Sequence, residues 1–335
     1  MTKPNNGNPV VDVIYGGQFG SEAKRLFTEY YVDKYKPDAI ISNFGPNSGG
    51  FVSDGSKWSA LPMDFGGIIM LSAGSIINID HLKDELFQMK CTPTVIIHEN
   101  ASVISPINLK NEEKLVNIGS TMQGTMEAVV SKMGRNPEME NQTAGSCRDE
   151  FPLAVKIVNN MDWVITLSEC KKILMVIPQG HSLSLNLGMY PYCTSRNTSP
   201  QQGLADAGVP IWWVNKIIGI FRTFPIRVSN RYNEEGKMIG FSGPCYHDQK
   251  EIKWEDIGVP PEITSVSKKV RRVFTFSMYQ FHESVIMNGC TDVFINFMNY
   301  IPENHRKEMI RELSKVGPKI SFVGYGPKIS DIEEI

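Results

Sequence analysis

The sequence lacks the features of a membrane protein, of a disulfide-stabilised fold and of a structural zinc site. No run approaches the roughly 18 apolar residues that a membrane-spanning helix needs, and the opening residues MTKPNNGN are polar. The six cysteines are scattered, without a C-x-x-C pair or a nearby histidine at zinc-ligand spacing. This usage is typical of free thiols in a reducing compartment. We therefore expect a cytoplasmic protein that has no membrane partner.

The charge balance is close to neutral. The formal net charge is −2, which gives no global field for nucleic acid. The one dense basic segment, residues 268–272, is too short for a duplex groove. We therefore expect no nucleic acid polymer among the partners. At 335 residues, of which 41% are hydrophobic, the chain can bury a sizeable core as one large α/β domain or two ordinary ones.

Residues 11–24, VDVIYGGQFGSEAK, combine an apolar run, a glycine-rich turn and a lysine. The β-branched and aromatic residues at 11–15 predict a buried strand, and the apolar spacing over 21–31 predicts a helix. The glycines allow a sharp turn and a close approach to a ligand, and a helix start with Lys24 nearby suits a phosphate. The turn matches neither a Walker A motif nor a G-x-G-x-x-G motif. A tight strand–helix connection without a ligand therefore stays open from these residues alone.

Other patterns predict the remaining elements. Short apolar or β-branched runs predict strands at 39–42, 68–71, 76–79, 94–98, 173–177 and 291–297. Helical spacing predicts helices at 81–90, with Asp80 as N-cap, at 126–132 and at 212–223. The aromatic pair Tyr190 and Tyr192 is expected in the core. The run at 173–177 is followed by Gln179, at the edge where open α/β sheets bind ligands.

Several segments together resemble one family. Residues 16–24, GGQFGSEAK, resemble the signature G-x-Q-W-G-D-E-G-K-G-K of adenylosuccinate synthetases. Further motifs of that family are resembled, in the same order, by FGPNSGGFV at 44–52, NIGSTMQGTMEAVVSKMGR at 117–135 and IPQGHSLSLNLGMYPYCTSRNTS at 177–199. Weaker likenesses follow at 263–272, where the family has its aspartate loop, and at 324–328.

The resemblance implies the adenylosuccinate synthetase fold in shortened form. This is an α/β fold with a P-loop-like, mostly parallel central sheet that is flanked by helices. It implies a single catalytic domain over 1–335. A small subdomain or loop insertion is expected at 136–150, and a variable segment at 229–258.

The resemblance also implies the residues of the site. Catalysis is expected from Ser21 and Lys24, and Mg²⁺ binding from Ser21 and the Gly49 carbonyl. The substrate nucleotide is expected to contact Ser21, Asn47, Thr121, Arg135, Gln179 and Thr194. Aspartate is expected to contact Thr264, Ser265 and Arg271, whose hydroxyls and planar cation suit a carboxylate. The nucleoside triphosphate is expected to contact Gly17, Gly20, Ala23, Lys24, Arg25, Gly49, Phe51, Asn296, Gly324 and Gly326. A homodimer is implied, in which Arg135 reaches the neighbour's substrate phosphate.

The chain departs from the family pattern at informative positions. Ser21 stands where the family has the Asp that takes the purine N1 proton, and the shorter side chain leaves room for a 2-amino group. Met298 stands where the family reads guanine with a carboxylate, and a methionine cannot accept those hydrogen bonds, whereas Asn296 can address adenine. Both changes favour a guanine nucleotide as substrate and ATP or dATP as phosphate donor. The pattern resembles the bacteriophage branch that makes N6-succino-2-amino-2′-deoxyadenylate from dGMP and L-aspartate for 2-aminoadenine DNA.

Two alternatives stay open from the sequence. The chain could be a divergent adenylosuccinate synthetase that uses IMP and GTP. Because Ser21 and Gly50 replace the family's catalytic Asp and His, it could also be a non-catalytic purine nucleotide sensor. An unactivated serine is a poor base, so the N1 proton would need another acceptor, such as Glu22 or the substrate aspartate.

Overall fold

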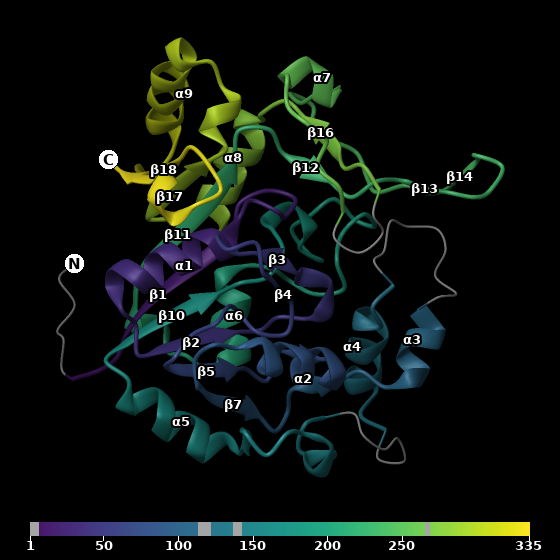
Figure 1. The fold of residues 1–335 in the computed structure, drawn as a ribbon, viewed down its shortest axis with the longest axis vertical. Coiled ribbons are helices and arrows are strands. Elements are labelled where there is room, and N and C mark those ends of the chain that lie inside the picture. The colour runs from purple at the N-terminus through teal and green to yellow at the C-terminus, as the bar shows by residue number, and fades with distance from the viewer. Residues whose placement is uncertain (1–6, 113–121, 137–142, 265–268) are drawn as a thin grey trace.

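The apolar runs of the sequence form the centre of a ten-stranded sheet in the computed structural model, which describes residues 7–112, 122–136, 143–264 and 269–335 (Figure 1). The strand order is β19-β18-β17-β11-β1-β10-β2-β5-β7-β9. Neighbouring strands are parallel, except that β19 runs antiparallel to β18. The strands are β1 (Val10–Gly16), β2 (Ala39–Ser42), β5 (Ile68–Leu71), β7 (Thr94–His98), β9 (Val155–Val158), β10 (Lys172–Val176), β11 (Val214–Arg222), β17 (Asp292–Asn296), β18 (Lys319–Gly324) and β19 (Ile332–Glu334).

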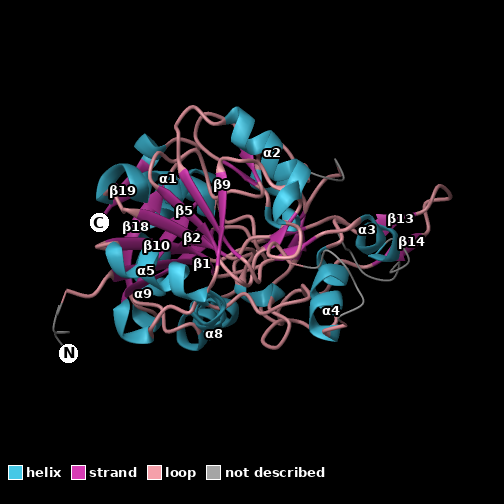
Figure 2. Cartoon of the chain, turned by 90° about the horizontal axis from the view of Figure 1, so that it is seen from below, coloured by secondary structure: helices cyan, strands magenta, loops and turns pink. Residues whose placement is uncertain are grey.

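Helices cover both faces of this sheet (Figure 2). Successive strand residues point to opposite faces, so Ile14 packs with Phe27 on one face, while Val13 and Tyr15 pack with Trp163 on the other. The main helices are α1 (Lys24–Tyr35), α2 (Ile79–Gln88), α5 (Asn160–Glu169), α6 (Pro200–Ala207), α8 (Met278–Met287) and α9 (Glu303–Val316). The predicted mostly parallel sheet flanked by helices is confirmed.

Smaller elements lie around one edge of the sheet. The hairpin of β13 (Arg231–Tyr232) and β14 (Met238–Gly240) projects from the body of the molecule (Figure 1). The other small strands are β3 (Gly50–Phe51), β4 (Lys57–Trp58), β6 (Ile76–Ile77), β8 (Ser102–Val103), β12 (Ile226–Arg227), β15 (Glu251–Ile252) and β16 (Arg272–Phe274). The short helices are α3 (Pro106–Glu112), α4 (Thr125–Gly134) and α7 (Trp254–Ile257).

Some predicted elements are wrong. Residues 212–223, predicted as a helix, form a short 3-10 turn and then the central strand β11. This strand is covered on both faces between β1 and β17, so its apolar residues are continuous and mimic a helical period. Helix α1 begins at Lys24 instead of Ser21, and α2 is capped by Asn78 instead of Asp80. Among the described residues, no helix is long and apolar enough to span a membrane.

Candidate active site

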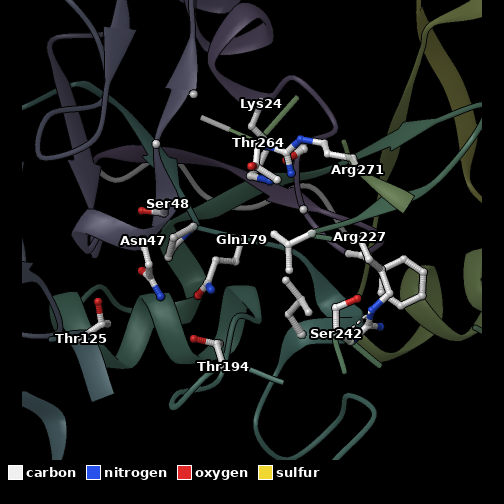
Figure 3. A pocket seen from close by; sticks show the side chains of 18 of the residues that line it. Lys24, Asn47, Ser48, Thr125, Gln179, Thr194, Arg227, Ser242, Thr264 and Arg271 are labelled. Carbon is white, nitrogen blue, oxygen red and sulfur yellow. Dashed lines mark hydrogen bonds between the residues drawn. The ribbon is translucent and has the colours of Figure 1, made fainter. Parts of the chain in front are cut away.

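A cavity of about 1240 Å³ lies at the carboxyl edge of the parallel strands. Its walls come from the segments that follow β1, β2, β10 and β17. Parallel strands bring these segments together because their carboxyl ends meet at one edge of the sheet. Figure 3 shows Lys24, Thr264 and Arg271 at one end of the cavity, and Thr125 and Thr194 at the other.

The glycine-rich turn after β1 is held from within by Glu22. This carboxylate is fully buried, and it accepts hydrogen bonds from the Gln18 and Gly20 amides at 3.1 and 2.7 Å. Its other oxygen lies 2.7 Å from the Lys24 ammonium. Both oxygens therefore shape the turn and fix Lys24 at the cavity wall, which disfavours Glu22 as a proton acceptor for a ligand.

Ser21 lines the cavity from an unusual backbone conformation. Its φ is 60°, and Ala23 has a φ of 68°, so the chain makes two left-handed steps before α1 begins. These steps also explain why the helix starts later than predicted. The Ser21 carbonyl accepts a hydrogen bond from Arg222, while its side chain is exposed to the cavity.

The turn after β10 packs directly on the glycine-rich turn. A Cβ on Gly180 would lie 2.5 Å from the Gln18 carbonyl oxygen and the Gly20 amide nitrogen, so only glycine fits there. Gln179, immediately before it, has a φ of 57° and lines the cavity. The sequence predicted Gln179 at this edge, and the structure places it there.

Polar atoms at the far end of the cavity lack partners within the described residues. The Gln179 Oε1, Asn47 Oδ1 and Thr125 Oγ1 atoms are buried and accept no hydrogen bond from the described part of the chain. Buried polar atoms are normally satisfied, so these atoms are suited to a polar ligand. Thr125 was missed as a site residue by sequence reasoning; a hydroxyl directly after Gly124, at the end of a Gly/Ser/Thr-rich turn that leads into a helix, was the available signal.

The described residues of the predicted aspartate-binding segment, among them Thr264, Lys269 and Arg271, line the opposite end of the cavity. The Thr264 amide donates to the Lys269 carbonyl at 2.8 Å, and the Lys269 amide donates to the Thr264 hydroxyl at 3.0 Å. Arg271 lines the cavity beside Thr264, and burial lowers its pKa. Ser265, and also Thr121, lie outside the described residues.

The segment after β17 supplies the third wall. The Asn296 side-chain oxygen accepts the Phe297 amide at 2.8 Å, and Phe297 has a φ of 62°. Met298 is fully buried in the core and does not line the cavity. Tyr190 is 77% exposed and lines the cavity together with Tyr192, so the prediction that this pair lies in the core is wrong.

Most of the predicted site residues line this cavity. They are Gly20, Ser21, Ala23, Lys24, Arg25, Asn47, Gly49, Phe51, Gln179, Thr194, Thr264, Arg271, Asn296 and Gly326. Gly17 and Gly324 do not line the cavity. They pack against other side chains instead, since a Cβ would overlap the Phe221 ring at Gly17 and the Asn296 side chain at Gly324. Arg135 is exposed directly after α4 and does not line the cavity of its own chain.

Cations dominate the cavity wall. The positively charged lining residues are Lys24, Arg25, Lys57, Arg227, Arg231, Lys269 and Arg271, against Glu112 and Glu262. Burial lowers the pKa of Arg25 and of Arg227 to about 10, and Arg227 donates from Nε to the Ser242 carbonyl at 2.6 Å (Figure 3). Arg227 and Arg231 were not predicted as site residues, since they come from segments where the sequence signal is weak. The cavity therefore suits polyanionic ligands such as nucleotides.

The described residues offer few ligands for a metal. They contain no cluster of three or more His, Cys, Asp or Glu side chains that could hold an ion. The predicted donors, the Ser21 hydroxyl and the Gly49 carbonyl, are neutral oxygens that line the cavity. Such a donor set fits Mg²⁺ only when the phosphates of a nucleotide supply most of its ligands.

Fold and site together define an α/β protein whose one large described cavity, rich in cationic side chains, suits a nucleotide. A sequence model described as adenylosuccinate synthetase matches residues 150–306. The chain is 32% identical to the N6-succino-2-amino-2′-deoxyadenylate synthase of Acinetobacter phage SH-Ab 15497, over 96% of this chain and 92% of that protein. It is 34% identical to the synthase of the same name from Vibrio phage phiVC8, over 96% of this chain and 97% of that protein. The chain belongs to the adenylosuccinate synthetase family.

A solved structure agrees with this assignment. The succinoaminodeoxyadenylate synthetase of cyanophage S-2L, solved with dGMP and dATP as an energy donor, matches with a TM-score of 0.89 and 31% identity. The match covers 98% of this chain and 95% of that one. The adenylosuccinate synthetase of Plasmodium falciparum shares the fold, with a TM-score of 0.80 at 15% identity over 97% of this chain and 99% of that one.

Proposed function

We propose that this protein is a ligase that joins L-aspartate to C6 of dGMP at the expense of ATP or dATP. O6 of dGMP takes the γ-phosphoryl group, and the aspartate amine then displaces the phosphate to give N6-succino-2-amino-2′-deoxyadenylate. This product is a precursor of 2-aminoadenine DNA. The observation that carries the proposal is that Ser21 lines the cavity. By the family resemblance it stands where the family has an aspartate, and its shorter side chain would leave space for a 2-amino group.

The walls of the cavity divide among the three ligands. The substrate nucleotide occupies the end that is lined by Asn47, Thr125, Gln179 and Thr194. The first three of these residues have buried polar atoms without a partner in the described part of the chain, and these atoms would bind the nucleotide. Thr121 contributes to the same end by the family resemblance. Aspartate occupies the end lined by Thr264 and Arg271, with Ser265 added by the family resemblance, and Lys24 lies at the phosphoryl group in transfer. The substrate aspartate accepts the N1 proton of dGMP. Glu22 is not free to do so, because one of its oxygens accepts the Gln18 and Gly20 amides and the other pairs with Lys24.

The donor base is adenine. Met298 is buried in the core, so this position offers no acceptor for the guanine N1 and N2 hydrogens. The Asn296 oxygen is engaged by the Phe297 amide, which leaves the side-chain NH₂ group as a donor toward an adenine ring nitrogen. Gly326 borders the same end of the cavity.

Mg²⁺ and a second subunit complete the proposed enzyme. The Ser21 hydroxyl and the Gly49 carbonyl would hold Mg²⁺ that arrives with the triphosphate and offsets the charge of the phosphoryl group. Arg135, exposed at the end of α4, would serve the partner's site in a homodimer. We treat residues 1–335 as one catalytic unit. All six cysteines are free, as suits a reducing compartment such as the cytoplasm.

Phosphate release tests the proposal. Purified protein is assayed with Mg²⁺, L-aspartate and either ATP or GTP, with dGMP or IMP as the nucleotide, and with aspartate omitted as the control. We expect aspartate-dependent release with dGMP and little with IMP. Turnover with IMP and GTP alone would instead make the protein an ordinary adenylosuccinate synthetase. Binding of dGMP and ATP without any phosphate release would make it a nucleotide sensor.

A further inference from the structure

Arg222 is a buried cation that contacts three walls of the cavity without lining it. It is the last residue of β11, and its side chain is fully buried. Its Nη1 donates to the Ser21 carbonyl at 3.0 Å and to Glu262 Oε2 at 3.2 Å, and its Nη2 pairs with Glu262 Oε1. The guanidinium also lies 4.0 Å from the centroid of the Phe297 ring. Ser21, Glu262 and Phe297 all line the cavity.

Each of these contacts belongs to a different ligand-binding segment. Ser21 is in the glycine-rich turn, and Phe297 follows the predicted base-reading residue. Glu262 precedes the predicted aspartate-binding segment, and its carbonyl accepts the Arg271 amide at 2.8 Å. The Arg222 guanidinium therefore connects two distant segments, since Ser21 is 201 residues and Glu262 is 40 residues from Arg222 in the sequence.

The pairing of Arg222 with Glu262 is bidentate, so it fixes the direction of the carboxylate as well as its distance. The Glu262 side chain is 27% exposed, whereas that of Arg222 is fully buried. The Arg222 Nε atom has no hydrogen-bond partner in the described part of the chain. Glu262 is thus the counterion of a buried charge, and a change at Glu262 must displace the guanidinium or leave it unpaired.

We propose that Arg222 and Glu262 form a positioning pair that sets the aspartate-binding segment against the glycine-rich turn. Arg222 itself does not line the cavity, and the pair acts through its contacts with the Ser21 carbonyl and, by way of the Glu262 backbone, with the Arg271 amide. This inference rests on the proposed function for the identity of the ligand. Its consequence is that the pair controls the use of aspartate more than the use of dGMP, whose proposed contacts lie at the far end of the cavity.

The chain offers a matched control. Arg272 and Glu251 form a second bidentate pair, with distances of 2.8 Å from Nε to Oε1 and 2.6 Å from Nη2 to Oε2. This pair joins β16 and β15, and neither residue lines the cavity. The change E251Q therefore removes one charge from a similar ion pair and leaves the Arg222–Glu262 pair unchanged.

The experiment compares E262Q with E251Q in the full-length protein. We expect E262Q to raise the Michaelis constant for aspartate roughly tenfold, because misplaced binding groups lose affinity steeply. The constant for dGMP should change less than about twofold. Arg222→Lys, which keeps the charge but loses the planar fork, should act in the same direction. Hydrogen exchange of the Arg271 amide gives a readout without turnover, and it should be faster in E262Q but not in E251Q.

The outcomes separate the two proposals. An unchanged aspartate constant and an unchanged exchange rate in E262Q would overturn the positioning role and leave the ligase proposal intact. An equal increase in E251Q would also overturn it, because the effect would then be general loosening. If the wild-type protein shows no aspartate-dependent phosphate release, the ligase proposal fails, and exchange at Arg271 still decides the positioning role.

Discussion

Ser21 combines a cavity-facing hydroxyl with a backbone φ of 60°, a conformation in which aspartate is found more often than most residues. The change S21D therefore adds a carboxylate to the cavity wall, beside the purine in the proposed binding mode, at little backbone cost. We expect kcat/KM for dGMP to fall about 100-fold, because the 2-amino group loses its space, and activity with IMP to rise. Phosphate release with each nucleotide measures both effects.

Ser21→Ala is the matched control for this change, since it removes the hydroxyl without adding charge or bulk. It should weaken the use of dGMP modestly and bring no gain with IMP. If S21A and S21D gain equally on IMP, the discrimination between the two purines does not depend on the carboxylate, and the assignment of Ser21 to the base edge is wrong.

Glu22 gives a second prediction for a single residue. Its carboxylate is fully buried between two backbone amides and the Lys24 ammonium, whose side chain is 11% exposed. E22Q keeps the shape but leaves that cation without its counterion, so the free energy of unfolding should fall by about 3 kcal/mol. Urea denaturation measures the loss. E29Q is the control, because Glu29 accepts hydrogen bonds from Ser53 and pairs with no cation among the described residues. Equal midpoints for the two variants would refute the prediction.

Among the elements, strands with continuous apolar runs could be predicted from the sequence. β2, β5 and β7 have the predicted bounds, because short β-branched segments carry their own signal. β11 could not, because it is a nine-residue strand, and a continuous apolar run of that length fits a buried helix as well as a buried strand.

The site shows the same division between local and tertiary signals. Residues that belong to a contiguous motif, such as Lys24 and Gln179, were found from the sequence. Arg227 and Arg231 were missed, because only the folding of distant segments brings them to the cavity, whereas Thr125 lies inside the motif at 117–135 and was overlooked there. The position of the two arginines in the cavity wall results from tertiary packing, which a local sequence pattern does not predict.

The contact between the turn after β10 and the glycine-rich turn gives a prediction for an element. A Cβ at position 180 would lie 2.5 Å from backbone atoms, which cannot move aside as a side chain can. Gly180→Ala should therefore lower the free energy of unfolding by about 2 to 3 kcal/mol and reduce phosphate release. Gly134→Ala is the control, because nothing lies within 4 Å of its Cβ position at the end of α4. A Gly180→Ala variant as stable and active as Gly134→Ala would contradict this packing.

At the scale of the whole molecule, the proposed homodimer, in which the exposed Arg135 serves the neighbouring subunit, predicts that each active site is shared between two subunits. R135A and K24A should each be nearly inactive as pure proteins. A heterodimer has one site with both defects and one with an intact Lys24 and an intact partner Arg135. Because random pairing makes half of the dimers mixed, an equal mixture should regain about a quarter of the wild-type rate. Phosphate release before and after subunit exchange measures the gain. A mixture that stays inactive, or an R135A protein with the wild-type Michaelis constant for dGMP, would show that Arg135 does not serve the partner's site.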